Sequence, residues 1–115
     1  MSTVELYDTT LRDGAQQQGI ALSVDDKVAI TERLDSIGID YIEGGYAGAN
    51  PKEDEFFSKS RQLSLSHAVV TAFGNTRRPG SSVSSDATIN ALLRTEAQVI
   101  TLVGKASEMQ VLEIL

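Results

Sequence analysis

Asp8, Arg12 and Asp13 bring two carboxylates and a guanidinium into a short stretch near the start of the chain, and Gly14 follows at once. The charge of Arg12 is permanent and its donors form a planar fork, so it suits a carbonyl or enolate oxygen on which negative charge develops. A salt bridge from Arg12 to Asp8 or Glu43 is the structural alternative, and the two roles are compatible. Taken alone, Asp13 is better explained by capping or a salt bridge, and Asp8 by turn formation or by support of a neighbouring site residue.

Glu43 is a further carboxylate at the end of an expected strand, where it could orient Arg12 or take part in proton transfer. A buried ion pair is the alternative. The glycines that follow, at positions 44, 45 and 48, would let a backbone approach a ligand closely or would serve turn geometry, and they match neither a dinucleotide fingerprint nor a P-loop. Tyr46 could form one wall of a small substrate pocket, or be a packed loop aromatic.

These residues need strands and helices to position them, and the sequence alternates the two. Patterns of apolar residues predict strands over 4–7, 41–43, 68–73 and 99–103. Predicted helices begin at the capping residue Ser23, near Pro51, at Asp86 and at Ser107, and Gly38 would end the first of them. The strands recur at about 30 residues, the size of a βα unit, which implies parallel strands and right-handed crossovers. Four such units fit half of a (β/α)8 barrel or a small doubly wound sheet.

The chain has 115 residues, of which 41 % are hydrophobic, and this suits one modest domain with a core. A complete (β/α)8 barrel needs roughly 250 residues, so residues 1–115 are expected to be the N-terminal half of one. Met1 to Thr3 looks like a natural N-terminus, and the chain stops within an apolar, helix-like run, so truncation of a longer chain is expected. Half of a barrel would leave open strand edges, which predicts self-association into homo-oligomers.

Charge and composition exclude several classes of protein. The net charge is -6, and Arg77 and Arg78 form the one basic pair, which argues against a nucleic-acid surface. That pair would follow the third strand, where it could attract an anionic substrate or coenzyme A phosphates or could be a solvated loop. No apolar run approaches the roughly 20 residues of a membrane span, and no signal peptide is visible, so a cytoplasmic location is expected. The absence of cysteine excludes disulfides, thiolate ligands and a cysteine nucleophile.

Four segments together carry a resemblance to a known family. The run Asp-Thr-Thr-Leu-Arg-Asp-Gly-Ala-Gln over residues 8–16 is similar to the N-terminal signature of the DRE-TIM metallolyases, which include isopropylmalate, homocitrate and citramalate synthases and hydroxymethylglutaryl-CoA lyase. Residues 41–52, 75–80 and 103–105 resemble the citramalate synthases in particular. The likeness runs from about residue 4 to about residue 110. Tyr46 departs from the tryptophan usual in that subgroup, and Gln17 and Gln18 from an acidic residue or glycine.

The resemblance implies half of a TIM barrel and a metal-assisted Claisen-type condensation of acetyl-CoA with a 2-keto acid, expected to be pyruvate, giving citramalate. It makes Asp13 one ligand of a divalent cation, Mg²⁺, Mn²⁺ or Zn²⁺, and Arg12 and Glu43 catalytic residues. It also places Arg12, Gln16 and Tyr46 at the substrate, with the Gln16 amide on the keto-acid carboxylate or on the water shell of the metal. The His-x-His pair that completes the family's metal site is absent here, and His67 is expected to be structural, at the opposite end of its strand.

Three alternatives stay open. A sister enzyme, 2-isopropylmalate or homocitrate synthase, would differ mainly in the residues of its pocket. A lyase of the hydroxymethylglutaryl-CoA type would cleave a carbon–carbon bond with the same Arg12 and Asp13. The isolated fragment could also be a non-catalytic half-barrel that pairs with itself, and it is expected to be inactive alone because the metal ligands and the base that abstracts the proton would come from the missing half.

Overall fold

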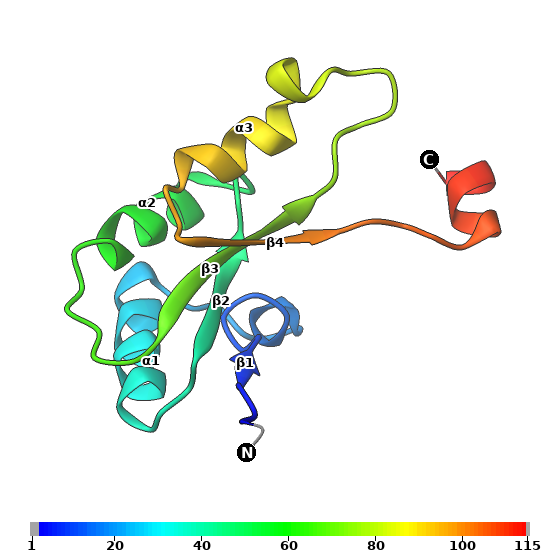
Figure 1. Ribbon diagram of the computed structural model, residues 1–115. Helices are drawn as coiled ribbons and strands as arrows, with labels where there is room; N and C mark the ends of the chain where they lie inside the picture. Colours follow the sequence, from blue (N-terminus) through cyan, green and yellow to red (C-terminus); the bar gives the residue numbers. More distant parts are fainter. Residues whose placement is uncertain (1–2, 115) are drawn as a thin grey trace.

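The computed structural model describes residues 3–114 and contains one parallel sheet of four strands in the order β1-β2-β3-β4. Helices α1, α2 and α3 connect successive strands, as Figure 1 shows. The strands are β1 (Tyr7–Asp8), β2 (Tyr41–Tyr46), β3 (Val69–Asn75) and β4 (Val99–Val103), and the helices are α1 (Val24–Ser36), α2 (Pro51–Ser60) and α3 (Ala87–Arg94). Short helical turns cover Gly14–Gln16, Val83–Ser85 and Gln110–Ile114.

The strand order distinguishes the two folds that the sequence left open. A doubly wound sheet reverses its strand order and carries helices on both faces. Here spatial order follows chain order, and the three helices lie on one face of the sheet (Figure 1). This arrangement is that of four consecutive βα units of a partial TIM barrel, so the predicted fold class is confirmed.

Local sequence signals explain where the helices begin. Ser23 caps α1 in a capping box with Asp26, each side chain accepting a hydrogen bond from the backbone of the other residue. Asn50 caps α2 ahead of Pro51. The carboxylate of Asp86 accepts hydrogen bonds from two backbone N–H groups at the start of α3. After α1, Gly38 has a φ of 92°, a conformation that favours glycine.

Three element boundaries differ from the prediction. The first strand, predicted over residues 4–7, is limited to Tyr7–Asp8 because those two residues pair with Tyr41 and Ile42. Strand β2 continues through its two glycines to Tyr46. The helix predicted from Ser107 is a single π-helical turn, Gln110–Ile114, and the Ser107 hydroxyl accepts a hydrogen bond from the N–H of Gln110.

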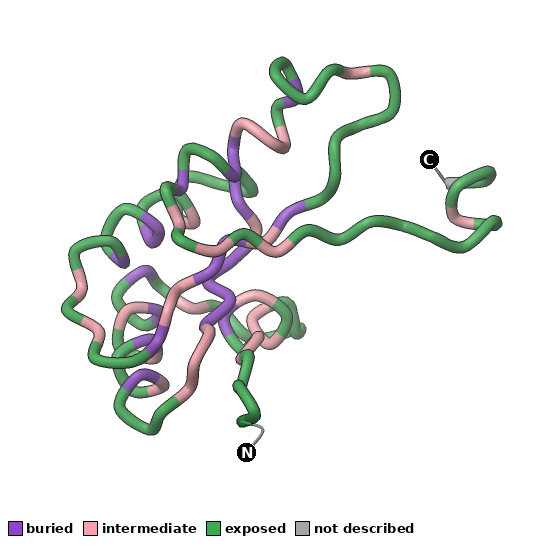
Figure 2. Tube along the Cα trace, viewed as in Figure 1, coloured by how far each residue is buried: buried purple, intermediate pink, exposed green. Residues whose placement is uncertain are grey.

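The apolar core lies between the sheet and the helices, and Figure 2 shows buried residues concentrated on the strands and on the helix faces turned toward them. Ile42, Phe56, Phe57 and Leu92 are among its most buried members, each at most 2 % exposed. Glycine is required in β2 at position 44, because a Cβ there would lie 2.7 Å from the Phe56 ring. No helix within residues 3–114 is long and apolar enough to cross a membrane.

Candidate functional site

Arg12 and Glu43 form an ion pair between the turn after β1 and strand β2. The Arg12 Nε donates to Glu43 Oε1, and Glu43 is buried at 2 % exposure. The guanidinium lies 4.1 Å from the centroid of the Phe73 ring, a cation–π contact that adds to the attraction. The structure therefore holds the Arg12 cation by a carboxylate on one side and an aromatic face on the other.

The turn that carries Arg12 is organised by its own backbone. The Thr9 carbonyl accepts hydrogen bonds from the N–H groups of Arg12, Asp13 and Gly14, at 3.2, 2.8 and 3.1 Å. The Asp8 carboxylate accepts from the N–H and the hydroxyl of Thr10 at 2.9 and 3.0 Å, as expected of a turn-forming residue. This tight loop directs the Arg12 side chain back toward β2.

A cavity of about 300 Å³ adjoins the guanidinium and brings predicted residues together. Its wall includes Arg12, Gln16 and Tyr46, from the loop after β1 and from the end of β2. The Tyr46 hydroxyl accepts a hydrogen bond of 2.6 Å from the Asn75 amide, and the Tyr46 ring packs edge-on against Phe73. The cavity thus has an aromatic wall, an amide and a cation at the carboxyl end of the sheet, where α/β barrels bind substrates.

Buried Lys27 and partly buried Glu53 form a second ion pair in the wall of the same cavity, and the sequence analysis missed it. Lys27 Nζ lies 2.7 Å from Glu53 Oε2 and 4.5 Å from the centroid of the Phe56 ring. Burial lowers the pKa of Lys27, and the hydrogen bond to Glu53 acts in the opposite direction. A Cβ at Gly45 would lie 1.7 Å from Glu53 Oε2, so the glycine leaves room for this pair.

The Tyr7 hydroxyl is another polar group that the sequence analysis did not single out. It donates to Glu43 Oε2, and it lies 3.0 Å from the Thr71 hydroxyl and 2.6 Å from that of Thr101. Burial, and then the hydrogen bond to Glu43, raise the pKa of Tyr7. One signal was visible in the sequence, because Tyr7 and Glu43 each stand near the end of a predicted strand.

Asp13 lies at the same end of the sheet but contributes a single carboxylate. Its side chain is 68 % exposed, with one oxygen 3.8 Å from Arg12 Nη1. Across residues 3–114 no three His, Cys, Asp or Glu side chains gather closely enough to hold a metal ion. The described residues do not complete a metal site, and the role of Asp13 as one ligand of a hard divalent cation stays a prediction.

Arg77, Arg78 and His67 lie outside the cavity wall. Arg77 Nη1 donates to the Ser81 carbonyl at 2.7 Å, within its own loop. The backbone N–H of Arg78 donates to the Asp86 carboxylate. His67 precedes β3 at the opposite end of the sheet, where its Nε2 lies 2.7 Å from Asp40 Oδ1. Its position is the one predicted for a structural histidine.

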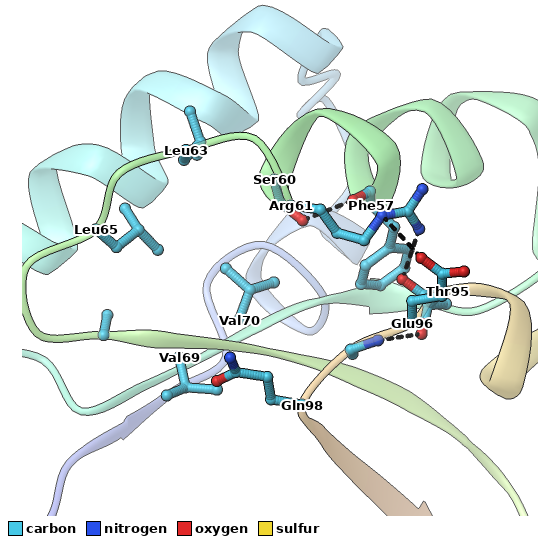
Figure 3. Close-up of a pocket in the computed structure, with 12 residues that line it drawn as sticks. Phe57, Ser60, Arg61, Leu63, Leu65, Val69, Val70, Thr95, Glu96 and Gln98 are labelled. Carbon is cyan, nitrogen blue, oxygen red and sulfur yellow. Dashed lines mark hydrogen bonds and ion pairs between the residues drawn. The ribbon is translucent and has the colours of Figure 1, made fainter.

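A larger cavity of about 420 Å³ lies between α2, the start of β3 and the connection from α3 to β4, as Figure 3 shows. The Arg61 guanidinium on its wall donates to the Thr95 carbonyl at 2.8 Å and lies 3.5 Å from the Glu96 carboxylate. The charged side chains on the wall of this larger cavity are thus paired with each other or with the backbone. Because it opens near the amino ends of β3 and β4, it is remote from Arg12 and Glu43, and the smaller cavity is the candidate site.

Sequence comparisons identify the family of the chain. Residues 3–114 match the family model described as HMGL-like. The chain is 46 % identical over 112 residues to an (R)-citramalate synthase of Aquifex aeolicus, which is 97 % of this chain and 21 % of that protein. It is 51 % identical over 107 residues to one of Streptomyces coelicolor, which is 92 % of this chain and 20 % of that protein.

A third similarity, 42 % identity over 65 residues, is to a probable 2-isopropylmalate synthase of Archaeoglobus fulgidus, and it covers 56 % of this chain and 13 % of that protein. The chain spans about a fifth of the length of the curated citramalate synthases it matches. The family model, in contrast, covers nearly the whole of the chain. The family expected from the motif over residues 8–16 is confirmed, and the chain belongs to the HMGL-like family.

Proposed function

We propose that this chain forms one wall of the active site of an acyltransferase that condenses acetyl-CoA with a 2-keto acid, namely pyruvate. Hydrolysis of the thioester by water then releases coenzyme A and gives citramalate. The observation that carries the proposal is the Arg12 cation, held by the buried Glu43 carboxylate and facing a cavity at the carboxyl end of the sheet. The similarity to (R)-citramalate synthases over more than nine-tenths of the chain supports the choice of reaction.

Arg12 is assigned to the negative charge that develops on the reacting oxygens, since a fixed guanidinium stabilises that charge without reorganisation. Glu43 is assigned to the orientation of Arg12. Both of its oxygens already accept hydrogen bonds, one from Arg12 and one from Tyr7, which leaves it poorly placed to take a proton from substrate. The Gln16 amide is assigned to the keto-acid carboxylate, and Tyr46 to one wall of the substrate pocket.

Asp13 is assigned to one ligand position of a divalent cation, Mg²⁺, Mn²⁺ or Zn²⁺, which when bound would polarise the keto oxygen. The remaining ligands are assigned to the part of the relatives' length that this chain does not span. So is the base that removes the methyl proton of acetyl-CoA, because Glu53, the carboxylate on the cavity wall, is paired with Lys27. The 115 residues alone are therefore expected to be inactive.

The test is thiol release from acetyl-CoA by the full-length protein that carries this segment, with Mg²⁺ or Mn²⁺ and a panel of 2-keto acids. We expect release with pyruvate, and a loss of about 100-fold or more in kcat for Arg12→Lys and Asp13→Asn. Asp25→Asn is the matched control, since that carboxylate is 89 % exposed and pairs with Lys59 on the surface. Release with a branched keto acid in place of pyruvate would instead support a 2-isopropylmalate synthase, which the partial similarity to a probable enzyme of that kind makes the second candidate.

Absence of thiol release with every keto acid would contradict the proposal. A carbon–carbon lyase of the hydroxymethylglutaryl-CoA type would then be tested by acetyl-CoA formation from a 3-hydroxyacyl-CoA. That reaction uses the same Arg12 in reverse, so Arg12→Lys would remain the diagnostic variant.

We also propose that the isolated chain associates with itself. Within residues 3–114 no strand pairs with the outer edge of β4. Ile100 and Leu102 on this strand are 37 % and 52 % exposed, and Met109 and Leu112, nearby in sequence, are 65 % and 70 % exposed. Open edges and exposed apolar side chains favour association. Light scattering after size-exclusion chromatography should give a mass above the 12.3 kDa of the monomer, and a monomer at every concentration would contradict this.

A further inference from the structure

The Tyr7 hydroxyl joins all four strands of the sheet through side chains. From β1 it reaches Glu43 on β2, Thr71 on β3 and Thr101 on β4. The last two contacts measure 3.0 and 2.6 Å and join residues 64 and 94 positions apart in the sequence. A tyrosine needed only for packing would require one partner for its hydroxyl, whereas this one has three.

Proton counting fixes the direction of these hydrogen bonds. A phenol carries one proton, and the Glu43 carboxylate, paired with the Arg12 guanidinium, can only accept. Tyr7 therefore donates to Glu43 Oε2. Its oxygen must then accept from the hydroxyls of Thr71 and Thr101, which are donors as well as acceptors. The chain of hydrogen bonds runs from the two threonines through Tyr7 to Glu43, and Arg12 approaches the other oxygen of that carboxylate.

Arg12 alone would leave Glu43 free to turn about its terminal torsion, since a single donor holds a single oxygen. The second donor removes that freedom. Glu43 is thereby fixed at both oxygens, and the guanidinium it binds stays over the Phe73 ring and at the cavity wall. Pre-orientation of this kind matters for a group that must meet developing charge without reorganising.

We propose that Tyr7 is a positioning residue for Arg12, acting through Glu43, so that its hydroxyl contributes to turnover rather than to substrate affinity. This inference rests on the proposed function for its kinetic part only. The positioning itself is a property of the chain and can be measured without any substrate.

The first test is nuclear magnetic resonance on the ¹⁵N-labelled 115-residue chain. In Tyr7→Phe, the Arg12 Nε–H is expected to exchange with water about tenfold faster than in the unaltered chain. Tyr41→Phe is the matched control, because the Tyr41 ring lies beside that of Tyr7, with centroids 6.1 Å apart, while the carboxylate that raises the pKa of Tyr41 is Glu5 and not Glu43. Unchanged exchange in Tyr7→Phe, or an equal change in both variants, would overturn the proposal.

Should Tyr7→Phe not fold, Thr101→Val serves in its place, since it removes a donor to the phenol oxygen while keeping the phenol. Its expected effect on the Arg12 Nε–H is in the same direction and about threefold. No change in exchange in this folded variant would count against the hydrogen-bond chain.

The second test is kinetic and uses the full-length protein. Tyr7→Phe should lower kcat about tenfold and leave KM for the keto acid within about twofold, and the loss should shrink to less than twofold in a Glu43→Gln background. A change in KM alone, or full additivity with Glu43→Gln, would overturn the positioning role. If the unaltered enzyme releases no thiol, the proposed function fails while the exchange measurement still decides whether Tyr7 positions Arg12.

Discussion

Two ion pairs at the carboxyl end of the sheet and one carboxylate at its amino end are held by different kinds of partner. At the carboxyl end, Arg12 binds Glu43 and Lys27 binds Glu53, and these two side-chain pairs line or adjoin one cavity. At the amino end, the Asp35 carboxylate accepts hydrogen bonds from the backbone N–H groups of residues 66, 67 and 68, at 2.9, 2.8 and 2.6 Å.

This contrast separates residues that are expected to serve catalysis from residues that connect elements of the fold. A backbone N–H group can move only if the surrounding fold changes. The hydrogen bonds of Asp35 therefore fix the end of α1 to the segment before β3. Side-chain cations can be exchanged, reoriented or turned toward a ligand, and each leaves an uncompensated charge when its partner is removed. Variants at the two ends should therefore differ in what they change: stability and function together at the carboxyl end, stability alone at the amino end.

The largest effect on stability is expected for Glu53→Gln. The variant leaves the Lys27 ammonium, at 2 % side-chain exposure, without its counterion, and removal of one partner from a buried pair costs about 3–5 kcal/mol of unfolding free energy. Urea denaturation of the chain measures it. The double variant Lys27→Met/Glu53→Gln removes both charges and should recover most of the loss. A Glu53→Gln variant as stable as the original chain would show that the pair is solvated.

The loss of unfolding free energy in Glu53→Gln should also depend on pH. Burial lowers the pKa of Lys27, so between the folded pKa and the unfolded value of about 10.4 the unfolded chain binds more protons, and the unfolding free energy rises with pH. Loss of Glu53 lowers the Lys27 pKa further, so the pH range over which the unfolding free energy rises extends to lower pH. Unfolding measured from pH 7 to pH 10 should show the deficit shrinking. A deficit that does not shrink would contradict this origin, and the Lys27→Met/Glu53→Gln double variant, which has no ammonium to titrate here, should show no pH-dependent gain in stability from this site.

Asp35→Asn should have the next largest effect, at the amino end. The N–H groups of Ala68, Ser66 and His67 lower the pKa of Asp35 to about 2, against an ordinary value of 3.8. A lowered carboxyl pKa contributes stability that is present above the ordinary value and is lost as the pH falls through about 2. At pH 7 the variant should melt roughly 5–10 °C lower, because an amide offers a single acceptor oxygen.

The pH dependence gives the control for Asp35→Asn. The difference in melting temperature from the original chain should narrow as the pH falls from about 4 toward 2, where the wild-type carboxylate takes up its proton. In the full-length enzyme the variant should keep its kcat at a temperature where it is folded. A lowered kcat at that temperature would contradict the claim that variants at the amino end of the sheet change stability alone.

The sequence was informative about local structure. The helix starts near Ser23, Pro51 and Asp86 depend on neighbouring positions. The side chains of Ser23, Asn50 and Asp86 accept hydrogen bonds from backbone N–H groups within three residues, and Pro51 suits the first position of a helix. The pairing of Arg12 with Glu43 could also be predicted, because parallel strands place their carboxyl ends at the same edge of the sheet. The length of β1 was not, since its two paired residues depend on the register with β2.

Two features of the site needed the assembled sheet. Lys27 follows two aspartates at the start of a helix, and this context predicts a solvated side chain. The packing of α1 on α2 instead encloses it with Glu53. Thr71 and Thr101 look like ordinary strand residues, and their role beside Tyr7 depends on the registers of three strand pairs. Contacts over such separations are set by tertiary structure, which no local pattern specifies.

The smallest effect is expected for His67→Gln, which tests the amino end from its exposed side. The His67 ring is 51 % exposed, and its contact with Asp40 is a surface pair of the kind that contributes little. Asp40 keeps its hydrogen bond from the Leu6 N–H at 2.7 Å, so the variant should melt within about 3 °C of the original chain and keep its kcat in the full-length enzyme. Calorimetry and the thiol-release assay measure the two quantities. A loss of activity would mean that His67 reaches the chemistry from the end of the sheet opposite Arg12, and the division of labour between the two ends would be wrong.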